Sequence, residues 1–149
     1  MKQTKTTYGE LNNQNLKVLI ALSRTTQAIH KRTAGLVAKY GLTMSQFAVL
    51  EALYHKGSMN ISEIIQSVLS TSGNMTVVIS NLDKLELITK CTNPEDKRSS
   101  LISITEKGRE IIEEIFPLHL KDLQVVFQAL SNEEKELLTA TLKKISTTL

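Results

Sequence analysis

The chain has 149 residues, of which 41% are hydrophobic and 22% charged, and these values fit one soluble domain with a helical extension and exclude wholesale disorder. No apolar run approaches the roughly 18 residues that a membrane-spanning helix needs, and the polar amino terminus lacks the apolar centre of a secretory signal. A single cysteine, Cys91, excludes an internal disulfide framework and cysteine-based zinc sites. Together with the missing signal, this predicts a chain in the reducing cytoplasm, and the lack of a long apolar run predicts no membrane partner.

The net charge of +3 is unevenly distributed along the chain. Residues 1–40 carry seven Lys and Arg against one Glu, a balance of +6, whereas the remaining residues sum to −3. This basic excess is compatible with a polyanionic partner, although many basic proteins bind no nucleic acid.

Apolar or small residues step by three and four through residues 16–40, which predicts one long amphipathic helix that stops at Gly41. Lys17, Arg24 and Lys31 recur every seven residues on another face of this helix. The basic stripe is either a solvated surface or a rim beside DNA.

Two capping boxes, Thr43–Gln46 and Asn60–Glu63, begin the next two helices, the first of which is expected to end near Gly57. A polar break at residues 70–73 precedes a third helix, in which apolar residues repeat at helical spacing through residues 75–85. Short helices joined by a tight polar turn favour a helix-turn-helix.

The outward face of the helix after that turn carries small or amide side chains. A solvated helix usually has Glu and Lys there, because they form helix better than Ser, Thr or Asn. Small hydrogen-bonding side chains suit a helix that lies in a DNA groove. The candidate DNA-contacting residues of this recognition helix are Ser72, Asn74, Thr76, Val77, Ser80, Asn81 and Lys84.

Residues 87–92 and 101–105 are β-prone runs rich in Ile and Thr, with the charged, turn-forming segment 93–100 between them. A hairpin directly after a helix-turn-helix is a wing. We therefore expect a mostly α fold with a small β wing.

The remainder of the chain is predicted to be helical. Thr105 can cap a helix that contains Pro117, which is expected to kink it, and a third capping box at Ser131–Glu134 opens the last helix. The first helix and the last two carry apolar stripes, and residues 43–105 are too few to cover them. A second chain is the natural cover, so we expect a symmetric homodimer.

The predicted organisation has three parts. Residues 1–42 form an N-terminal dimerisation helix, residues 43–105 a winged helix-turn-helix DNA-binding domain, and residues 106–149 the C-terminal dimerisation helices.

This order of elements resembles the MarR type of bacterial transcription regulators over nearly the whole chain. Asp96-Lys97-Arg98-Ser99 resembles the wing-tip motif Asp-x-Arg-Ser of that family, and residues 104–108, Ile-Thr-Glu-Lys-Gly, are similar to its Leu-Thr-Glu-Lys-Gly. Residues 130–134 fit the start of its last helix.

The resemblance implies a homodimer that places its recognition helices in successive major grooves of a palindromic operator. Asp96, Lys97, Arg98 and Ser99 would then contact DNA, with Arg98 in the minor groove and Asp96 holding its guanidinium. A narrow minor groove concentrates negative potential, which suits a planar guanidinium. The resemblance also implies a small aromatic or phenolic effector, of unidentified structure, between the winged domain and the dimer helices, with no other cofactor.

Two positions depart from the family pattern. Val77 stands where the family often has Arg, which leaves Lys84 as the cation of the recognition helix, and Glu86 stands where it usually has Gly. Val77 affects the strength and the sequence preference of base readout. Glu86 replaces the residue best able to adopt a left-handed helix end.

No motif for catalysis or metal binding is found. The chain has no Gly-rich phosphate loop and no nucleophile elbow, and His30, His55 and His119 lack ligand spacing. Cys91 is interpreted as structural rather than redox-active.

The sequence thus predicts a ligand-responsive, sequence-specific DNA-binding regulator, a repressor rather than an enzyme. The alternative is a winged-helix protein–protein interaction module. Arg98 with Asp96 beside it favours the DNA-binding regulator over the protein–protein interaction module.

Overall fold

The computed structural model describes residues 6–68 and 75–149. Ser72, Asn74 and the predicted turn at residues 70–73 therefore lie outside the described residues. The elements are α1 (Glu10–Ala38), α2 (Met44–Lys56), α3 (Ile61–Ser67), α4 (Met75–Lys84), β1 (Ile88–Thr92), β2 (Ser100–Ile104), α5 (Glu106–Phe127) and α6 (Asn132–Ser146).

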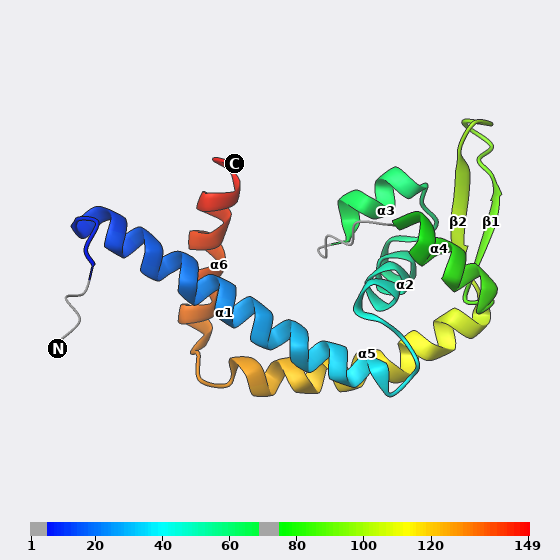
Figure 1. Ribbon diagram of the computed structural model, residues 1–149. Coiled ribbons are helices and arrows are strands. Elements are labelled where there is room, and N and C mark those ends of the chain that lie inside the picture. The colour runs from blue at the N-terminus through cyan, green and yellow to red at the C-terminus, as the bar shows by residue number, and fades with distance from the viewer. Residues whose placement is uncertain (1–5, 69–74) are drawn as a thin grey trace.

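The predicted mostly α fold with a small β wing is confirmed (Figure 1). The winged domain, α2 to β2, lies at one end of the paired helices α1 and α5, and α6 lies at the other end. The two strands pair antiparallel with Ile88 opposite Ile104 and Thr92 opposite Ser100.

All three predicted capping boxes are confirmed. At the start of α2 the Thr43 hydroxyl accepts from the Gln46 amide N–H at 3.2 Å, and the Gln46 side chain accepts from the Thr43 N–H at 2.9 Å. The same exchange joins Asn60 to Glu63 at α3 and Ser131 to Glu134 at α6. Each box satisfies two amides that the helix leaves without partners.

Helix α1 begins at Glu10, six residues before the predicted Leu16. The added residues are polar, so apolar spacing gives no sign of them, but their backbone bonds continue the helix, as from the Asn13 N–H to the Gly9 carbonyl at 2.9 Å. Helix α5 runs through Pro117, and the kink predicted there remains a prediction.

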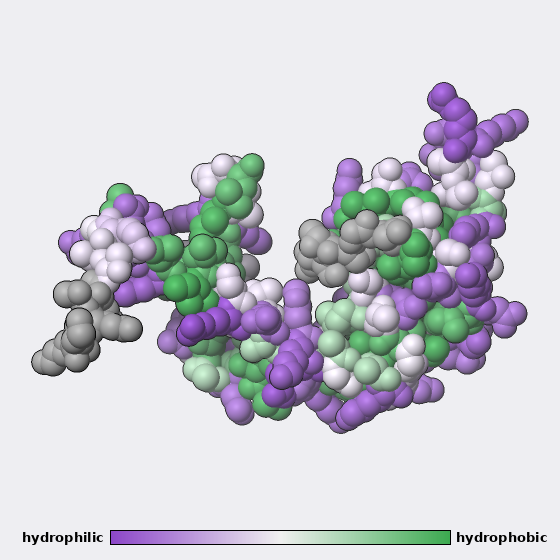
Figure 2. Space-filling view, viewed as in Figure 1, coloured by the Kyte–Doolittle hydropathy of each residue, from purple (hydrophilic) through white to green (hydrophobic). Residues whose placement is uncertain are grey.

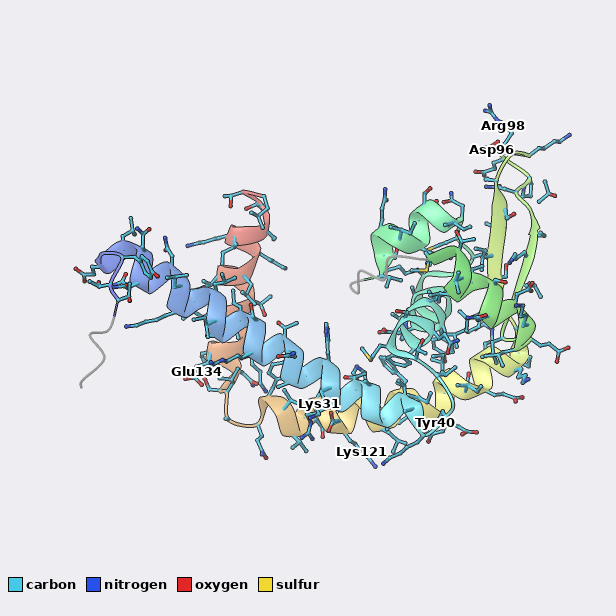
Figure 3. The ribbon with its side chains drawn as sticks, in the orientation of Figure 1. Lys31, Tyr40, Asp96, Arg98, Lys121 and Glu134 are labelled. Carbon is cyan, nitrogen blue, oxygen red and sulfur yellow. The ribbon has the colours of Figure 1, made fainter. Side chains whose placement is uncertain are left out.

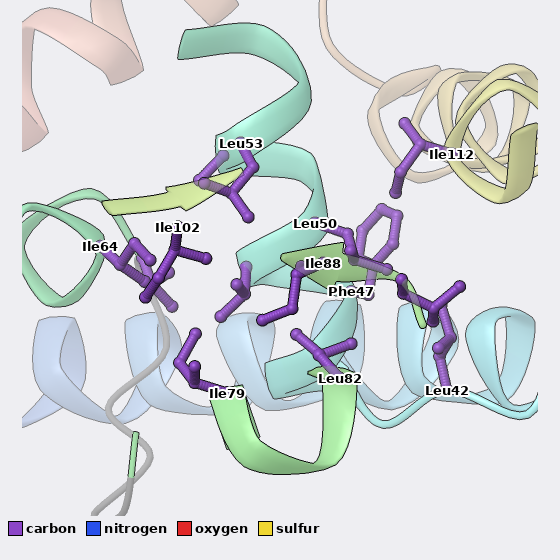
Figure 4. Packing of buried hydrophobic residues seen from close by; sticks show 14 of the residues in the cluster. Leu42, Phe47, Leu50, Leu53, Ile64, Ile79, Leu82, Ile88, Ile102 and Ile112 are labelled. Atoms are coloured by element: carbon purple, nitrogen blue, oxygen red, sulfur yellow. The ribbon is translucent and has the colours of Figure 1, made fainter. Parts of the chain in front are cut away.

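The hydrophobic core lies between the helices of the winged domain, the roots of the two strands and the first half of α5 (Figure 4). Leu50 and Leu53 of α2 meet Ile79 and Leu82 of α4 in this core, and all four are essentially without solvent exposure. Ile112 of α5 is buried in the same cluster. The winged domain is therefore fixed to α5 by packing as well as by chain connection.

The helices outside the winged domain leave much of their apolar surface uncovered. Helix α6 has no buried residue among those described, and the buried residues of α1, Thr33 and Val37, lie in its last turns. Figure 2 shows hydrophobic atoms gathered on α6 and the adjoining part of α1. The exposed apolar residues of α1 and α6 are Leu11, Leu16, Val18, Leu19, Ile20, Leu137, Leu138, Leu142 and Ile145.

An ion pair joins the last third of α1 to the last third of α5. The Arg32 Nε donates to the two carboxylate oxygens of Asp122 at 3.1 and 3.2 Å. This hydrogen bond holds the pKa of the Asp122 carboxyl below its usual value. Its contribution to stability is therefore present above the ordinary carboxyl pKa and is lost as the pH falls through the lowered one.

Within residues 6–68 and 75–149, no helix combines the length and hydropathy needed to cross a membrane.

Candidate nucleic-acid interface

Helix α4 has one face in the core and one face directed outward. Met75, Ile79 and Leu82 are buried on the first face. The five described candidates of the recognition helix recur at intervals of three and four along the other face. Thr76, Val77 and Lys84 are exposed there, and Ser80 and Asn81 are half-buried.

The end of α4 has a left-handed residue, Glu86, with φ of 60°. The Leu87 N–H bonds to the Leu82 carbonyl at 3.0 Å, and the Glu86 N–H bonds to the Asp83 carbonyl at 2.9 Å. These two bonds define a Schellman motif, in which glycine is the usual left-handed residue. Position 86, where the family usually has glycine, therefore has a left-handed backbone, and in this chain a glutamate adopts it.

The start of α5 is joined directly to that end of α4. The Thr105 hydroxyl donates to the Glu86 carbonyl at 2.7 Å, and the Lys107 Nζ donates to the Leu85 carbonyl at 2.9 Å. Gly108 is buried beneath Leu87, where an added Cβ would overlap the Leu87 carbonyl oxygen. Residues 105–108 thus form a rigid joint between the recognition helix and a long helix outside the winged domain.

The wing tip is fixed by its own hydrogen bonds. The Ser99 N–H bonds to the Asp96 carbonyl at 3.0 Å, and the Asn93 N–H bonds to the Ser99 carbonyl at 3.0 Å. Asp96 and Arg98 lie at the far end of the hairpin, away from the rest of the molecule (Figure 3).

Arg98 is held by Asp96 but remains open to solvent. Its backbone N–H donates to Asp96 Oδ1 at 3.0 Å, and its Nε lies 3.5 Å from the same oxygen, with the side chain 95% exposed. Lys97 beside it is exposed, and Ser99 is half-buried. The tip therefore presents two cations, one of which is oriented by a carboxylate.

The base of the wing is fixed to the domain. Met59, between α2 and α3, exchanges two backbone hydrogen bonds with Ile102 of β2, at 3.0 and 2.8 Å. Lys90 of β1 lies 3.9 Å from the carboxylate of Asp83 on α4. The wing and the recognition helix consequently have a defined relative position.

Cys91 is exposed on β1, and its Sγ faces the Leu101 carbonyl at 3.7 Å. It lies on the wing surface and is not part of the core. Among the described residues, no group of three or more His, Cys, Asp and Glu side chains is placed to hold a metal ion.

A cavity lies between α1, α2 and α5, where the family resemblance implied an effector, but the residues that line it were not predicted. It brings together His30, His55 and His119, which lie far apart in the chain and show no spacing pattern. Periodicity describes one helix at a time, so it cannot show which residues of separate helices face the same space. The sequence therefore gave no sign that these three histidines face one cavity.

Residues 33–115 match the family described as transcriptional regulator SarA/Rot. The HTH-type transcriptional regulator MhqR of Bacillus subtilis (strain 168) is 36% identical over 135 residues, which cover 91% of this chain and 93% of that protein. The chain belongs to the MarR-type winged-helix transcription regulators.

Solved structures of this family have the same fold. BpsR of Bordetella bronchiseptica superposes with a TM-score of 0.77 at 26% identity, covering 87% of this chain and 92% of that one. A MarR mutant from E. coli, complexed with operator DNA, gives a TM-score of 0.79 at 23% identity over 92% of this chain and 99% of that one. The resemblance stated from the sequence is thereby confirmed.

Proposed function

We propose that this chain is a homodimeric, ligand-responsive repressor that binds a palindromic operator sequence-specifically in the cytoplasm and has no catalytic role. The observation that carries the proposal is the wing tip. Arg98 is almost fully exposed at the end of a hydrogen-bonded hairpin and is paired with Asp96. An exposed cation held ready in this way suits the minor groove, where insertion of a free side chain would cost conformational entropy.

The recognition helix would occupy the adjacent major groove. Asn81 and Thr76 on its outward face can bond base edges, and Val77 can contact a thymine methyl group. Lys84 lies near the end of the helix and suits a phosphate. Ser72 and Asn74 before the helix, and Lys97 and Ser99 on the wing, complete the proposed contact set.

A second copy would supply the other half of the interface. The apolar faces of α1, α5 and α6 need a partner, and a twofold axis through them would give two recognition helices and two wings. A pair of equivalent helices is what a palindromic site requires.

We propose a small aromatic or phenolic effector bound in the cavity between α1, α2 and α5. The related BpsR supports this class of compound, since DNA binding of that protein is regulated by 6-hydroxynicotinic acid. Bound there, an effector would contact both the winged domain and the helices proposed to form the dimer.

The proposal is tested by selecting bound DNA from a random pool and then titrating the selected site at several salt concentrations. A dimer with about 6 to 8 phosphate contacts should give a log–log slope of about −5 to −7. Lys84→Ala should make that slope less steep by about 2 for the dimer, because one phosphate in each half-site would no longer be neutralised. An unselective pool with a slope close to zero would instead favour the protein-interaction module.

A further inference from the structure

A groove of about 830 Å³ runs between the last turns of α1 and the second half of α5, and its volume lies in the range of small-molecule sites. Two of its residues, Tyr40 and Lys121, lie at the edge of the molecule opposite the wing tip (Figure 3). Its lining shares no residue with the cavity between α1, α2 and α5. The groove is therefore a separate feature, which the proposed regulator does not use.

Aliphatic side chains line part of the groove. Leu36 of α1 is half-buried against the core, and Leu118 and Val125 of α5 are exposed. Gly35 lies beside them, and nothing lies within 4 Å of a Cβ added there. These residues offer apolar surface and open space to the aliphatic part of a ligand.

The same groove carries a net positive charge. Three cations, Arg32, Lys39 and Lys121, line it together with one carboxylate, Asp122, which leaves +2. Arg32 donates to Asp122 through its Nε and Nη2, so its Nη1 is available to another acceptor. Lys39 and Lys121 are exposed, and neither forms an ion pair within residues 6–68 and 75–149. Cations gathered without matching carboxylates attract an anion.

The proposed homodimer would leave this groove accessible. The exposed apolar residues of α1 that a second copy would cover lie within residues 11–20, whereas the groove uses residues 32–40. Helix α6, whose apolar face also needs a partner, contributes no residue to the described lining. A ligand can therefore reach the groove from solvent.

We propose that this groove binds a soluble phosphate monoester with an aliphatic body. Such a phosphate carries about 1.5 to 2 negative charges near pH 7, which matches the net charge of the lining. Lys39 and Lys121 donate to the phosphate oxygens, and the Tyr40 hydroxyl can donate to a further one. Leu118 and Val125 cover the aliphatic body.

The ligand bound in this way links α1 to α5 beside the ion pair of Arg32 with Asp122. The described lining contains no residue of the winged domain. The ligand should consequently raise the melting temperature of the chain by holding the two long helices together, and it should do so without occupying the effector cavity.

The test is isothermal titration calorimetry on the full chain without DNA, with hexyl phosphate, hexyl sulfate, hexanol and inorganic phosphate as probes. Hexyl phosphate should bind at least about tenfold more tightly than inorganic phosphate, since burial of two methylene groups suffices for that factor. Hexyl sulfate has the same body and one charge fewer, so it should bind about fivefold more weakly than hexyl phosphate, the upper limit for an exposed ion pair. Hexanol, which lacks the charge, should bind more weakly still.

Three variants locate the site. Lys39→Gln and Lys121→Gln each remove one cation and should each weaken hexyl phosphate by about fivefold. Gly35→Leu keeps every charge but fills the open space, so it should bind hexyl phosphate no more tightly than inorganic phosphate. Lys31→Gln is the matched control, since it removes the same charge from α1 outside the groove and should leave the affinity unchanged.

The inference is overturned if hexyl phosphate binds no better than inorganic phosphate, if hexyl sulfate binds equally tightly, or if both lysine variants bind hexyl phosphate as the parent does. Cosedimentation with phosphatidylcholine vesicles that contain phosphatidate distinguishes a lipid headgroup from a soluble compound. Vesicle binding by the parent that is lost in Lys39→Gln and Lys121→Gln would overturn the assignment to a soluble ligand, and absence of vesicle binding supports it.

Discussion

Arg98 differs from an ordinary surface cation in how it is held. Both its backbone N–H and its guanidinium lie against one oxygen of Asp96, although the side chain is 95% exposed. An exposed arginine usually loses entropy when it is fixed in a groove, and a partner two residues away reduces that loss. The contact is therefore expected to matter for binding more than for folding.

Arg98→Ala should weaken operator binding by about 1–3 kcal/mol per wing, by analogy with a well-formed base-edge contact. The loss should be greatest on operators with A·T-rich flanks, where the minor groove is narrow. Asp96→Ala should reduce the same flank preference by a smaller amount. Fluorescence anisotropy titrations on operators varied in the flank and in the centre measure both effects.

Lys97→Ala is the matched control, since it removes a cation from the same tip. It should weaken all operators alike, because a flexible lysine meets phosphates rather than reading groove width. If Arg98→Ala binds every operator as well as the parent, the wing does not enter the groove.

Glu86 is a non-glycine residue with a left-handed backbone, at φ of 60°. A non-glycine residue in the left-handed region costs about 1–2 kcal/mol. Glu86→Gly should therefore raise the free energy of unfolding by about 1 kcal/mol. The greater chain entropy of glycine in the unfolded state acts in the opposite direction and reduces this gain. Urea denaturation measures the change.

Glu86→Ala separates backbone strain from loss of the carboxylate. It retains a Cβ and should give no such gain. Equal stabilisation by alanine and glycine would show that charge, not the left-handed backbone, is responsible.

At the level of elements, the joint between α4 and α5 gives a structural role to residues 104–108, which in the sequence were notable only for their similarity to a family motif. Thr105 caps α5 and bonds to the Glu86 carbonyl, and Lys107 bonds to the carbonyl of Leu85, the residue that follows α4. Gly108 allows the two backbones to approach. These residues maintain the position of the recognition helix and have no need to touch DNA.

Gly108→Ala should destabilise the fold by about 1–3 kcal/mol, because the new methyl group would overlap the Leu87 carbonyl oxygen and force the joint apart. Thermal and urea denaturation measure this loss, and operator affinity should fall with it.

Gly35→Ala is the matched control in α1, where nothing lies within 4 Å of an added Cβ. There the better helix propensity of alanine should stabilise by about 0.5–1 kcal/mol. Stabilisation by both substitutions would contradict the close approach at Gly108.

At the level of the whole molecule, the long helices expose much apolar surface in a single chain. Leu137 of α6 is 69% exposed and Leu11 of α1 is 71% exposed, with further apolar residues around both. Apolar surface of this extent is what the proposed homodimer would cover.

Sedimentation velocity should show a stable dimer at micromolar concentration. Leu142→Glu, which places a charge within the apolar face of α6, should shift the protein toward monomer because an unpaired charge would be buried. Ile65→Glu is the matched control, since it changes an exposed apolar residue of α3 outside the proposed interface and should leave the dimer intact. A parent that remains monomeric would remove the basis for binding at two half-sites.

Local chemistry determined most of the elements. The three capping boxes, the hairpin and the helical repeats depend on residues within a few positions of one another, so the sequence alone predicted them. The wing-tip pair of Asp96 and Arg98 is equally local, and its geometry follows from a separation of two residues. The polar start of α1 was missed because it contributes no apolar period.

Only the tertiary structure decided what depends on contacts between distant segments. The grouping of His30, His55 and His119 around one cavity arises from the packing of three helices, and no spacing within the chain encodes it. The bonds from Thr105 and Lys107 to the end of α4 likewise cross a hairpin of about twenty residues. Sequence periodicity specifies which face of a helix is buried, but the neighbours of that face are set by how the whole core packs.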